Sequence, residues 1–360
     1  MEYHFKNLVF EGGGVKGTAY AGALDILEQK GIMDSIVRVG GTSAGAITAL
    51  LVGLKYTRAQ IEAEIRALDF RKLLDDSFGV IRDTSRLLNE FGWYRGDYFR
   101  QWAGERIKAR TGNSESTFND VSSLRETKKF LDLYFIGTNL STGYSEVFSA
   151  EHTPRMCIAD AVRISMSIPL FFAAKRSVRG DVYVDGGMLD NYPVKLFDRQ
   201  KYIDKFSHVP EYYKAHNDEL FSDGKLNDPY VFNEETLGFR LDSAAEIAVF
   251  RDHAEPAPAR IDDFFDYVKA LMKTILNAQD GIHLHSDDWQ RTVYIDTLGV
   301  GTTDFDLSDE RKTQLVQSGR TGALKYFEWY DNPANKPVNR PLEPIIPPQG
   351  TDRRKRKDNP

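Results

Sequence analysis

The chain has 360 residues, of which 41% are hydrophobic and 28% are charged. This length and composition favour one large domain or two modest ones with a sizeable core, and they exclude wholesale disorder. The 47 basic residues against 53 acidic ones give a net charge of −6, which excludes a general nucleic-acid binder. The single cysteine, Cys157, excludes an intramolecular disulfide and is compatible with a reducing compartment.

No segment of the sequence has the pattern of a membrane span or a leader. The longest nearly uncharged apolar stretch, residues 44–54, is too short to cross a bilayer. The first residues lack the apolar run of a signal peptide. We therefore expect a cytoplasmic protein whose attachment to membranes, if any, is peripheral.

The first sixty residues alternate between strand and helix signals. Strands are predicted at residues 8–10 and 35–39, and helices at 18–30 and 44–54. This β-α-β-α order is typical of a parallel sheet covered by helices. Further strands are predicted later in the chain, at residues 131–136, 181–184 and 292–295. The expected fold is α/β, with three α/β/α layers, a mostly parallel central sheet, and helical or irregular insertions.

Two polar segments, residues 85–130 and 200–240, interrupt this rhythm and are interpreted as insertions that cap the site. A later apolar stripe has helical spacing, which usually indicates packing on a core. Its members are Ile261, Phe264, Phe265, Val268, Leu271, Met272, Ile275 and Leu276.

The last residues, 333–360, differ in composition from the rest of the chain. They contain seven prolines and a basic run at 353–357. Because proline at this density prevents a packed element, we expect a flexible tail. Its basic run could contact anionic head groups, or could simply be solvated.

The segment 12–17 matches the pattern G-x-G-x-x-G between a predicted strand and a predicted helix. A dinucleotide site needs an acidic residue about 20 positions further on, and the second strand ends at Val39 and Gly40 without one. A phosphate-binding P-loop needs Gly-Lys-Ser/Thr, whereas the order here is Lys-Gly-Thr. The remaining functional interpretation is an oxyanion hole, in which backbone N–H groups at a helix N-terminus meet developing negative charge. A plain tight turn is the structural alternative.

A second glycine motif, Gly-Thr-Ser-Ala-Gly at residues 41–45, lies between the second strand and the next helix. In this position G-x-S-x-G forms a nucleophile elbow, a strained turn that exposes the serine hydroxyl. The helix N-terminus that follows would stabilise alkoxide character. We therefore predict Ser43 as a nucleophile, with Gly41 and Gly45 permitting the turn.

A serine nucleophile needs a base. None of the seven histidines follows a convincing predicted strand, and the pair His283 and His285 lacks further ligands, so we predict no metal. The better candidate is Asp185, which ends an apolar strand and precedes Gly186 and Gly187. Strand ends in a parallel sheet present catalytic side chains, although an aspartate that only caps the turn would look the same.

Together the three motifs, at residues 12–17, 41–45 and 185–187, resemble the patatin-like phospholipase family, which uses a Ser-Asp dyad. The resemblance covers residues 5–325 and includes four supporting segments, at 161–169, 190–193, 236–241 and 293–308. The chain has Asp-Gly-Gly where many relatives have Asp-Gly-Ala, and Lys16 where relatives often have arginine. Neither difference removes a reacting group.

The resemblance implies a mechanism as well as a fold. Asp185 accepts the Ser43 proton as Ser43 attacks an ester carbonyl, and water activated by Asp185 then hydrolyses the acyl-enzyme. No cofactor is implied. The oxyanion hole is placed at the first glycine turn, and its members are Gly12, Gly13, Gly14 and Val15, supported by Lys16 and Gly17. Lys16 either holds an anionic phosphate or is an exposed side chain.

The implied substrate is a lipid acyl ester, a phospholipid or lysophospholipid, so the expected partner is a lipid or a membrane surface. Two other classes stay open. One is a serine esterase or thioesterase with a non-lipid substrate. The other is a regulatory protein that keeps the fold without turnover, and a closed cap would require an activating partner.

Overall fold

The computed structural model describes most of the chain, namely residues 3–68, 86–203, 208–222, 224, 228–244, 258, 260–284 and 287–340, with the side chains of 265 and 280–284 left out. The predicted basic run at 353–357 and the side chains of His283 and His285 lie outside the described residues.

The described strands form an eight-stranded central sheet in the order β10-β9-β1-β2-β4-β8-β7, with β5 paired to β4. The four pairings among β10, β9, β1, β2 and β4 are parallel, and the pairings of β5, β7 and β8 are antiparallel. This confirms the predicted α/β fold with a mostly parallel sheet. The strands are β1 (Asn7–Phe10), β2 (Arg38–Gly41), β4 (Asp132–Asn139), β5 (Tyr144–Ser149), β7 (Lys175–Arg176), β8 (Val182–Asp185), β9 (Thr236–Asp242) and β10 (Thr292–Asp296). A separate pair consists of β3 (Gly92–Tyr94) and β6 (Leu170–Phe172).

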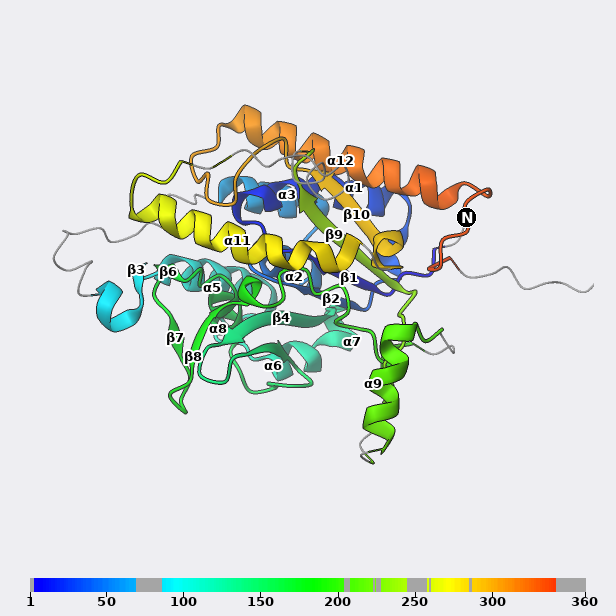
Figure 1. Cartoon of the computed structure of the whole chain (residues 1–360), viewed down its shortest axis with the longest axis horizontal. Helices are drawn as coiled ribbons and strands as arrows, with labels where there is room; N and C mark the ends of the chain where they lie inside the picture. The colour runs from blue at the N-terminus through cyan, green and yellow to red at the C-terminus, as the bar shows by residue number, and fades with distance from the viewer. Residues whose placement is uncertain are drawn as a thin grey trace, which may run out of the picture.

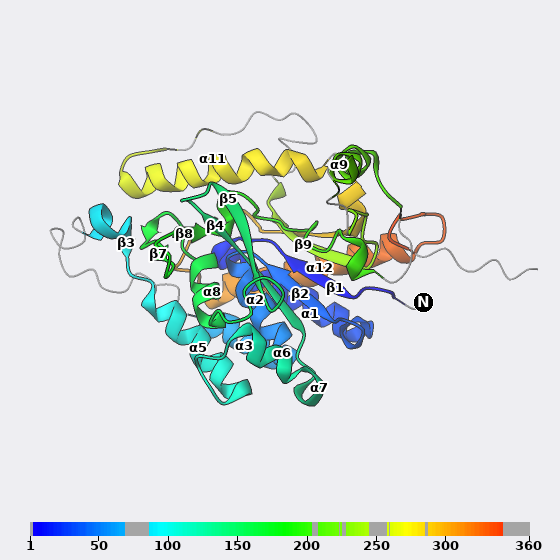
Figure 2. The same ribbon diagram turned by 90° about the horizontal axis from the view of Figure 1, so that it is seen from below.

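Helices lie on both sides of the sheet (Figures 1 and 2). Figure 2 shows α11 lying across the molecule on the side opposite α1, α3 and α5. No helix among the described residues is both long enough and apolar enough to cross a membrane. The α-helices are α1 (Tyr20–Gln29), α2 (Ala44–Gly53), α3 (Arg58–Ala67), α5 (Asp97–Thr111), α6 (Phe118–Ser123), α7 (Arg125–Lys128), α8 (Ile158–Ser165), α9 (Glu211–Ser222), α11 (Phe264–Leu284) and α12 (Asp309–Asp331). The short 3₁₀ turns are η1 (Gly14–Ala19), η2 (Ile32–Asp34), η4 (Gly186–Met188), η5 (Gln200–Tyr202) and η6 (Asp287–Arg291).

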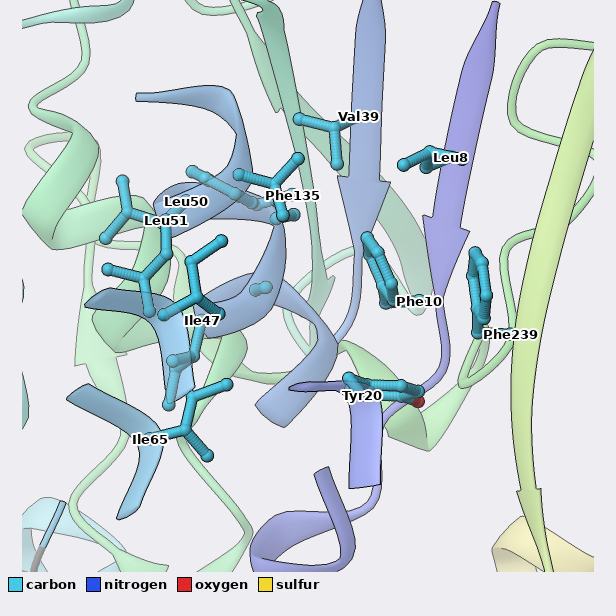
Figure 3. Close-up of a cluster of buried hydrophobic side chains, with 14 of the residues drawn as sticks. Leu8, Phe10, Tyr20, Val39, Ile47, Leu50, Leu51, Ile65, Phe135 and Phe239 are labelled. Atoms are coloured by element: carbon cyan, nitrogen blue, oxygen red, sulfur yellow. The ribbon is translucent and has the colours of Figure 1, made fainter. Parts of the chain in front are cut away.

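The core lies between the parallel strands and the helices that follow them (Figure 3). Every residue of α2 is buried, which explains why its sequence is almost entirely apolar. The ring of Phe10, at the end of β1, lies 5.1 Å from that of Tyr20 and 5.0 Å from that of Phe239. This packing anchors the end of β1 just before the first glycine turn.

Two strand predictions differ from the structure in an informative way. The second strand begins at Arg38 instead of residue 35, because the Ser35 hydroxyl donates to Phe5 O and Ile32 O and holds the preceding turn. Asp185 ends a strand as predicted, but β8 is antiparallel to its neighbour, with Asp185 opposite Gly137. Because β4 extends beyond the end of β2, this return strand brings Asp185 to the level of Ser43.

The two segments that were expected to cap the site contain ordinary elements. Residues 85–130 include α5, α6 and α7, and 200–240 include α9, which projects from the body of the molecule (Figure 1). The first residues of the predicted tail, 333–340, pack against the body of the protein instead of extending freely. The Asn339 side chain is buried, and the Tyr330 hydroxyl of α12 donates to Asn339 O.

The chain after β8 covers the second face of the sheet. Phe197 packs against the buried residues Val9 and Tyr134 of β1 and β4. The adjacent Asp198 is fully buried and accepts two hydrogen bonds, of 2.6 and 2.7 Å, from the guanidinium of Arg291. This ion pair joins the segment that follows Asp185 to the chain just before β10.

Helices α1 and α12 cross at two glycines. A methyl group on Gly22 would overlap the backbone of Val316, and one on Gly319 would overlap the backbone of Ala19. The missing side chains therefore allow the two helix backbones to touch, which draws α1, and the glycine turn before it, against α12.

We expect Gly319→Ala to lower the free energy of unfolding by about 3 kcal/mol, because the backbone at Ala19, directly before α1, must move away from the new methyl group. Gly104→Ala in α5 is the matched control, since its methyl group would meet only Ser114 atoms at 3.4 and 3.5 Å. That variant should gain roughly 0.5–1 kcal/mol of helix propensity. Urea unfolding of both variants measures the difference, and equal stabilities would contradict the close crossing.

Candidate active site

Ser43 lies in a strained turn between β2 and α2. Its backbone has φ 54° and ψ −124°, outside the conformations that a non-glycine residue prefers. A methyl group on Gly45 would overlap the carbonyl of Phe10, and one on Gly41 would come within 2.5 Å of Gly45. The glycines of G-x-S-x-G are therefore explained by close backbone contact. The turn holds the Ser43 side chain at the N-terminus of α2, where it is only 5% exposed.

The first glycine turn lies directly beside Ser43. A methyl group on Gly12 would be 3.1 Å from Ser43 Cβ. Of the four predicted oxyanion residues, two already use their N–H groups, because Gly12 donates to Asn191 O at 3.0 Å and Val15 to Thr302 O at 3.3 Å. The N–H groups of Gly13 and Gly14 have no acceptor within the described part of the chain. These two N–H groups are thus available to a ligand.

Asp185 is buried, with 3% of its surface exposed. Its Oδ1 accepts a hydrogen bond of 2.8 Å from the N–H of Gly187, which also caps the following turn. Its Oδ2 is buried and has no hydrogen-bond partner among the residues described. Burial raises the pKa of Asp185 from 3.8 to about 7, while the Gly187 N–H and the nearby Ser43 hydroxyl act to lower it. The site therefore holds a carboxyl group that exchanges protons near neutral pH.

Three buried side chains that were not singled out as site residues hold these turns. Ser165 at the end of α8 accepts the Ser43 N–H at 2.9 Å. Asn191 donates to Glu11 Oε1 and to Gly12 O, both at 3.2 Å, and Glu11 Oε2 also accepts the N–H of Leu241 at 2.6 Å. Ser165 and Asn191 lie in segments 161–169 and 190–193, which belong to the family resemblance. That resemblance is the sequence feature from which the two residues could have been identified as part of the site.

A cavity of about 260 Å³ contains Ser43 and Asp185, and α11 supplies one of its walls. None of the described residues of 85–130 and 200–240 lines it. Val268 of α11 is buried, but Phe264 and Leu271 are 39% and 40% exposed, so the predicted stripe packs inward only in part. The apolar lining consists of Ile168, Phe171, Leu241, Val268, Met272, Leu276 and Val300.

The cavity also contains charged groups. Lys16 lines it and donates to Leu241 O at 3.4 Å, and Lys269 and Lys273 of α11 line it as well. No cluster of histidine, cysteine and acidic side chains that could hold a metal ion occurs among the described residues. The other predicted support residues, Gly17, Gly186 and Gly187, lie against Ala44, Ile136 and Asn191.

In an α/β sheet, a serine on a strained turn, a glycine-rich turn beside it and a buried aspartate form the arrangement typical of a serine-hydrolase site. The family model described as patatin-like phospholipase matches residues 8–198 of this chain, and the chain belongs to that family. This confirms the resemblance seen in the sequence.

Individual relatives include YqhO of Bacillus subtilis, an uncharacterized protein that is 29% identical over 87% of this chain and 94% of its own length. The probable lipid hydrolase 463L of Invertebrate iridescent virus 6 is 25% identical over 54% of this chain and 63% of its own. Among solved structures, VipD from Legionella pneumophila has the same fold, with a TM-score of 0.58 and 19% identity over 90% of this chain and 67% of that one.

The raised pKa of Asp185 has a consequence for stability. The folded chain keeps the proton on Asp185 up to about pH 7, whereas the unfolded chain loses it near pH 3.8, so stability falls as the pH rises through this window. Asp185→Asn removes this dependence. We expect the free energy of unfolding of the variant, relative to that of wild type, to be about 2–3 kcal/mol higher at pH 8 than at pH 5. The size follows from roughly 1.4 kcal/mol per pKa unit.

Chemical denaturation at pH 5, 6, 7 and 8 measures this difference. The exposed Asp218 of α9 provides the control, because Asp218→Asn removes a carboxylate from the surface instead of the interior. Its stability relative to wild type should stay constant over the same range. A constant difference for Asp185→Asn as well would contradict a raised pKa.

Proposed function

We propose that this protein is a serine acylhydrolase that cleaves fatty-acyl esters of lipids, in the manner of a phospholipase A or a lysophospholipase. The observation that carries the proposal is the placement of Ser43, on a strained turn at a helix N-terminus, beside a buried carboxyl group with an unpartnered oxygen. The family, whose model is described as patatin-like phospholipase, supports an ester as the substrate.

The reaction begins with a proton transfer. Asp185 Oδ2 accepts the proton of the Ser43 hydroxyl as Ser43 Oγ attacks the ester carbonyl. A carboxylate with the ordinary pKa of aspartate is a weak base, but a pKa of about 7 brings Asp185 close to the working pH. Burial, which raises the pKa, therefore makes this aspartate a better partner for serine.

The tetrahedral intermediate carries negative charge on the former carbonyl oxygen. The N–H groups of Gly13 and Gly14 are free to donate to it, at the start of η1. Collapse of the intermediate breaks the ester bond, and the proton held by Asp185 passes to the leaving alcohol. Water then gives a proton to Asp185 and attacks the acyl-Ser43 ester, which releases the fatty acid and restores the hydroxyl.

The lining of the cavity supports a lipid substrate. Its apolar side chains from α11 and from the segment around Ile168 provide contacts for an acyl chain. Lys16, Lys269 and Lys273 supply positive charge in the same cavity, which suits a phosphate head group. The expected partner is therefore a lipid or a membrane surface.

The direct test is hydrolysis of fluorogenic phospholipid vesicles by the full chain. We expect Ser43→Ala and Asp185→Asn each to reduce the rate by at least about 10³-fold, as removal of a nucleophile or its base does in serine hydrolases. Ser123→Ala and Asp218→Asn alter a surface serine and a surface aspartate and should retain wild-type rates.

If the full chain does not hydrolyse phospholipid vesicles, its activity on other substrates decides between the two alternatives. Hydrolysis of acyl thioesters or small soluble esters without hydrolysis of lipid would favour the non-lipid esterase. Absence of all hydrolysis, together with no labelling of Ser43 by a fluorophosphonate, would contradict the proposed enzyme and favour a regulatory protein.

The pH dependence of kcat/KM provides a separate prediction. Asp185 must be unprotonated to accept the Ser43 proton, so activity should fall as the pH drops below about 7, the pKa of this group. A profile on a soluble ester between pH 5 and pH 9 measures it. An acidic limb near pH 4 would contradict Asp185 as a base in its buried state.

A further inference from the structure

Helix α11 contacts the turn that follows Asp185 through one side-chain amide. Gln279 Oε1 accepts the N–H of Asn191 at 2.9 Å, and Gln279 Nε2 donates to Gly187 O at 2.8 Å and to Met188 O at 3.3 Å. Both ends of the amide are thus used, and both are directed at the segment that carries the proposed base.

Two of the three residues that Gln279 contacts, Gly187 and Asn191, are bonded in turn to Asp185 and to the first glycine turn. The N–H of Gly187 donates to Asp185 Oδ1, so the residue that holds the carboxylate is itself held by Gln279 through its carbonyl. Asn191 accepts the N–H of Gly12 on its backbone carbonyl and donates to Gly12 O from its side chain. Gln279 therefore joins α11 to the turn with the base and to the turn proposed as oxyanion hole.

Other described residues of α11 meet the site in a different way. Val268, Met272 and Leu276 present apolar surface to the cavity, and apolar contacts do not specify direction. The polar residues Lys269, Lys273 and Asn277 line the cavity as well. Hydrogen bonds require both distance and alignment. An amide that both donates and accepts therefore sets the position of the helix relative to the Asp185 turn in a way that the apolar side chains do not.

We propose that Gln279 is a positioning residue that couples the placement of α11 to the orientation of the Asp185 carboxylate. The inference rests on the proposed function in one respect, that Asp185 is the base. It assigns α11 two roles, as a wall of the substrate cavity and as a support of the base. A lipid substrate or a membrane surface that moves α11 would thereby also change the position of the Gly187 N–H relative to the Asp185 carboxylate.

The effect on the proton affinity of Asp185 has a definite sign. The Gly187 N–H stabilises the charged carboxylate, so a looser turn weakens that bond and raises the pKa of Asp185. The other charged residues that line the cavity are Glu11, Lys16, Asp242, Lys269, Lys273 and Asp304, and none of them is substituted in a Gln279 variant. Gln279→Ala adds no charge, so a shift of the Asp185 pKa in that variant is attributable to the turn.

Two variants separate the parts of the amide, and a third serves as a control. Gln279→Ala removes both the donor and the acceptor. Gln279→Glu keeps the shape and the acceptor for the Asn191 N–H, but at pH 8 its carboxylate cannot donate to Gly187 O. Thr274→Ala on the exposed face of α11 is the control, since the Thr274 hydroxyl bonds only within its own helix, to Ala270 O.

For Gln279→Ala and Gln279→Glu we expect kcat on a soluble ester to fall on the order of tenfold at pH 8, with KM changed by less than about twofold. The acidic limb of kcat should move to higher pH. Thr274→Ala should match wild type in all three quantities. A rise in KM alone, with kcat and the pH limb unchanged, would overturn the inference, because it would reduce Gln279 to a wall of the cavity.

A second measurement is independent of turnover. The carboxyl carbon of Asp185, identified in ¹³C NMR as the signal missing from Asp185→Asn, can be titrated in wild type and in Gln279→Ala, which adds no charge. A higher pKa in folded Gln279→Ala supports the inference even if no ester is hydrolysed, in which case the proposed function alone fails. An unchanged titration in a variant with wild-type thermal stability would overturn the inference.

Discussion

The site depends on a contact between two backbone turns that leaves no room for side chains. The turn after β1 and the turn after β2 lie so close together that a methyl group on Gly45 would overlap the Phe10 carbonyl, and one on Gly12 would lie 3.1 Å from Ser43 Cβ. Parallel pairing of β1 with β2 sets this separation, because Phe10 and Gly41 are opposite each other at the ends of the strands. The strained backbone of Ser43 is sustained by the buried helix α2 that follows it.

The second constraint is electrostatic. Asp185 is buried without a cation among the groups that shift its pKa, so desolvation is the leading influence and the protonated form is favoured. A nearby lysine or arginine would stabilise the carboxylate and lower its basicity. The charged carboxylate is thus the less stable form of Asp185 at neutral pH, although it is the form that the proposed mechanism requires.

Helix α11 shows why an amphipathic pattern does not by itself reveal what a helix covers. Its apolar residues point both toward the cavity, as Val268 does, and toward solvent, as Phe264 and Leu271 do. Hydrophobic spacing predicts a helix and a buried stripe, yet the same spacing arises whether the stripe meets a core or a substrate cavity. Gln279 had no signal in the sequence, because a glutamine within a helix is ordinary until its partners are known.

The sequence by itself determined the α/β fold, the family, and the short motifs around Ser43 and Asp185, because these depend on local features. Apolar runs, glycines and a serine before a buried helix are readable along the chain. The tertiary structure decided that Asp185 arrives on an antiparallel strand, that Gly12 and Val15 have already used their N–H groups, and that α11 lines the cavity whereas the described residues of 85–130 and 200–240 do not. Strand direction, hydrogen-bond partners and burial depend on residues far apart in sequence, and only packing brings those residues together.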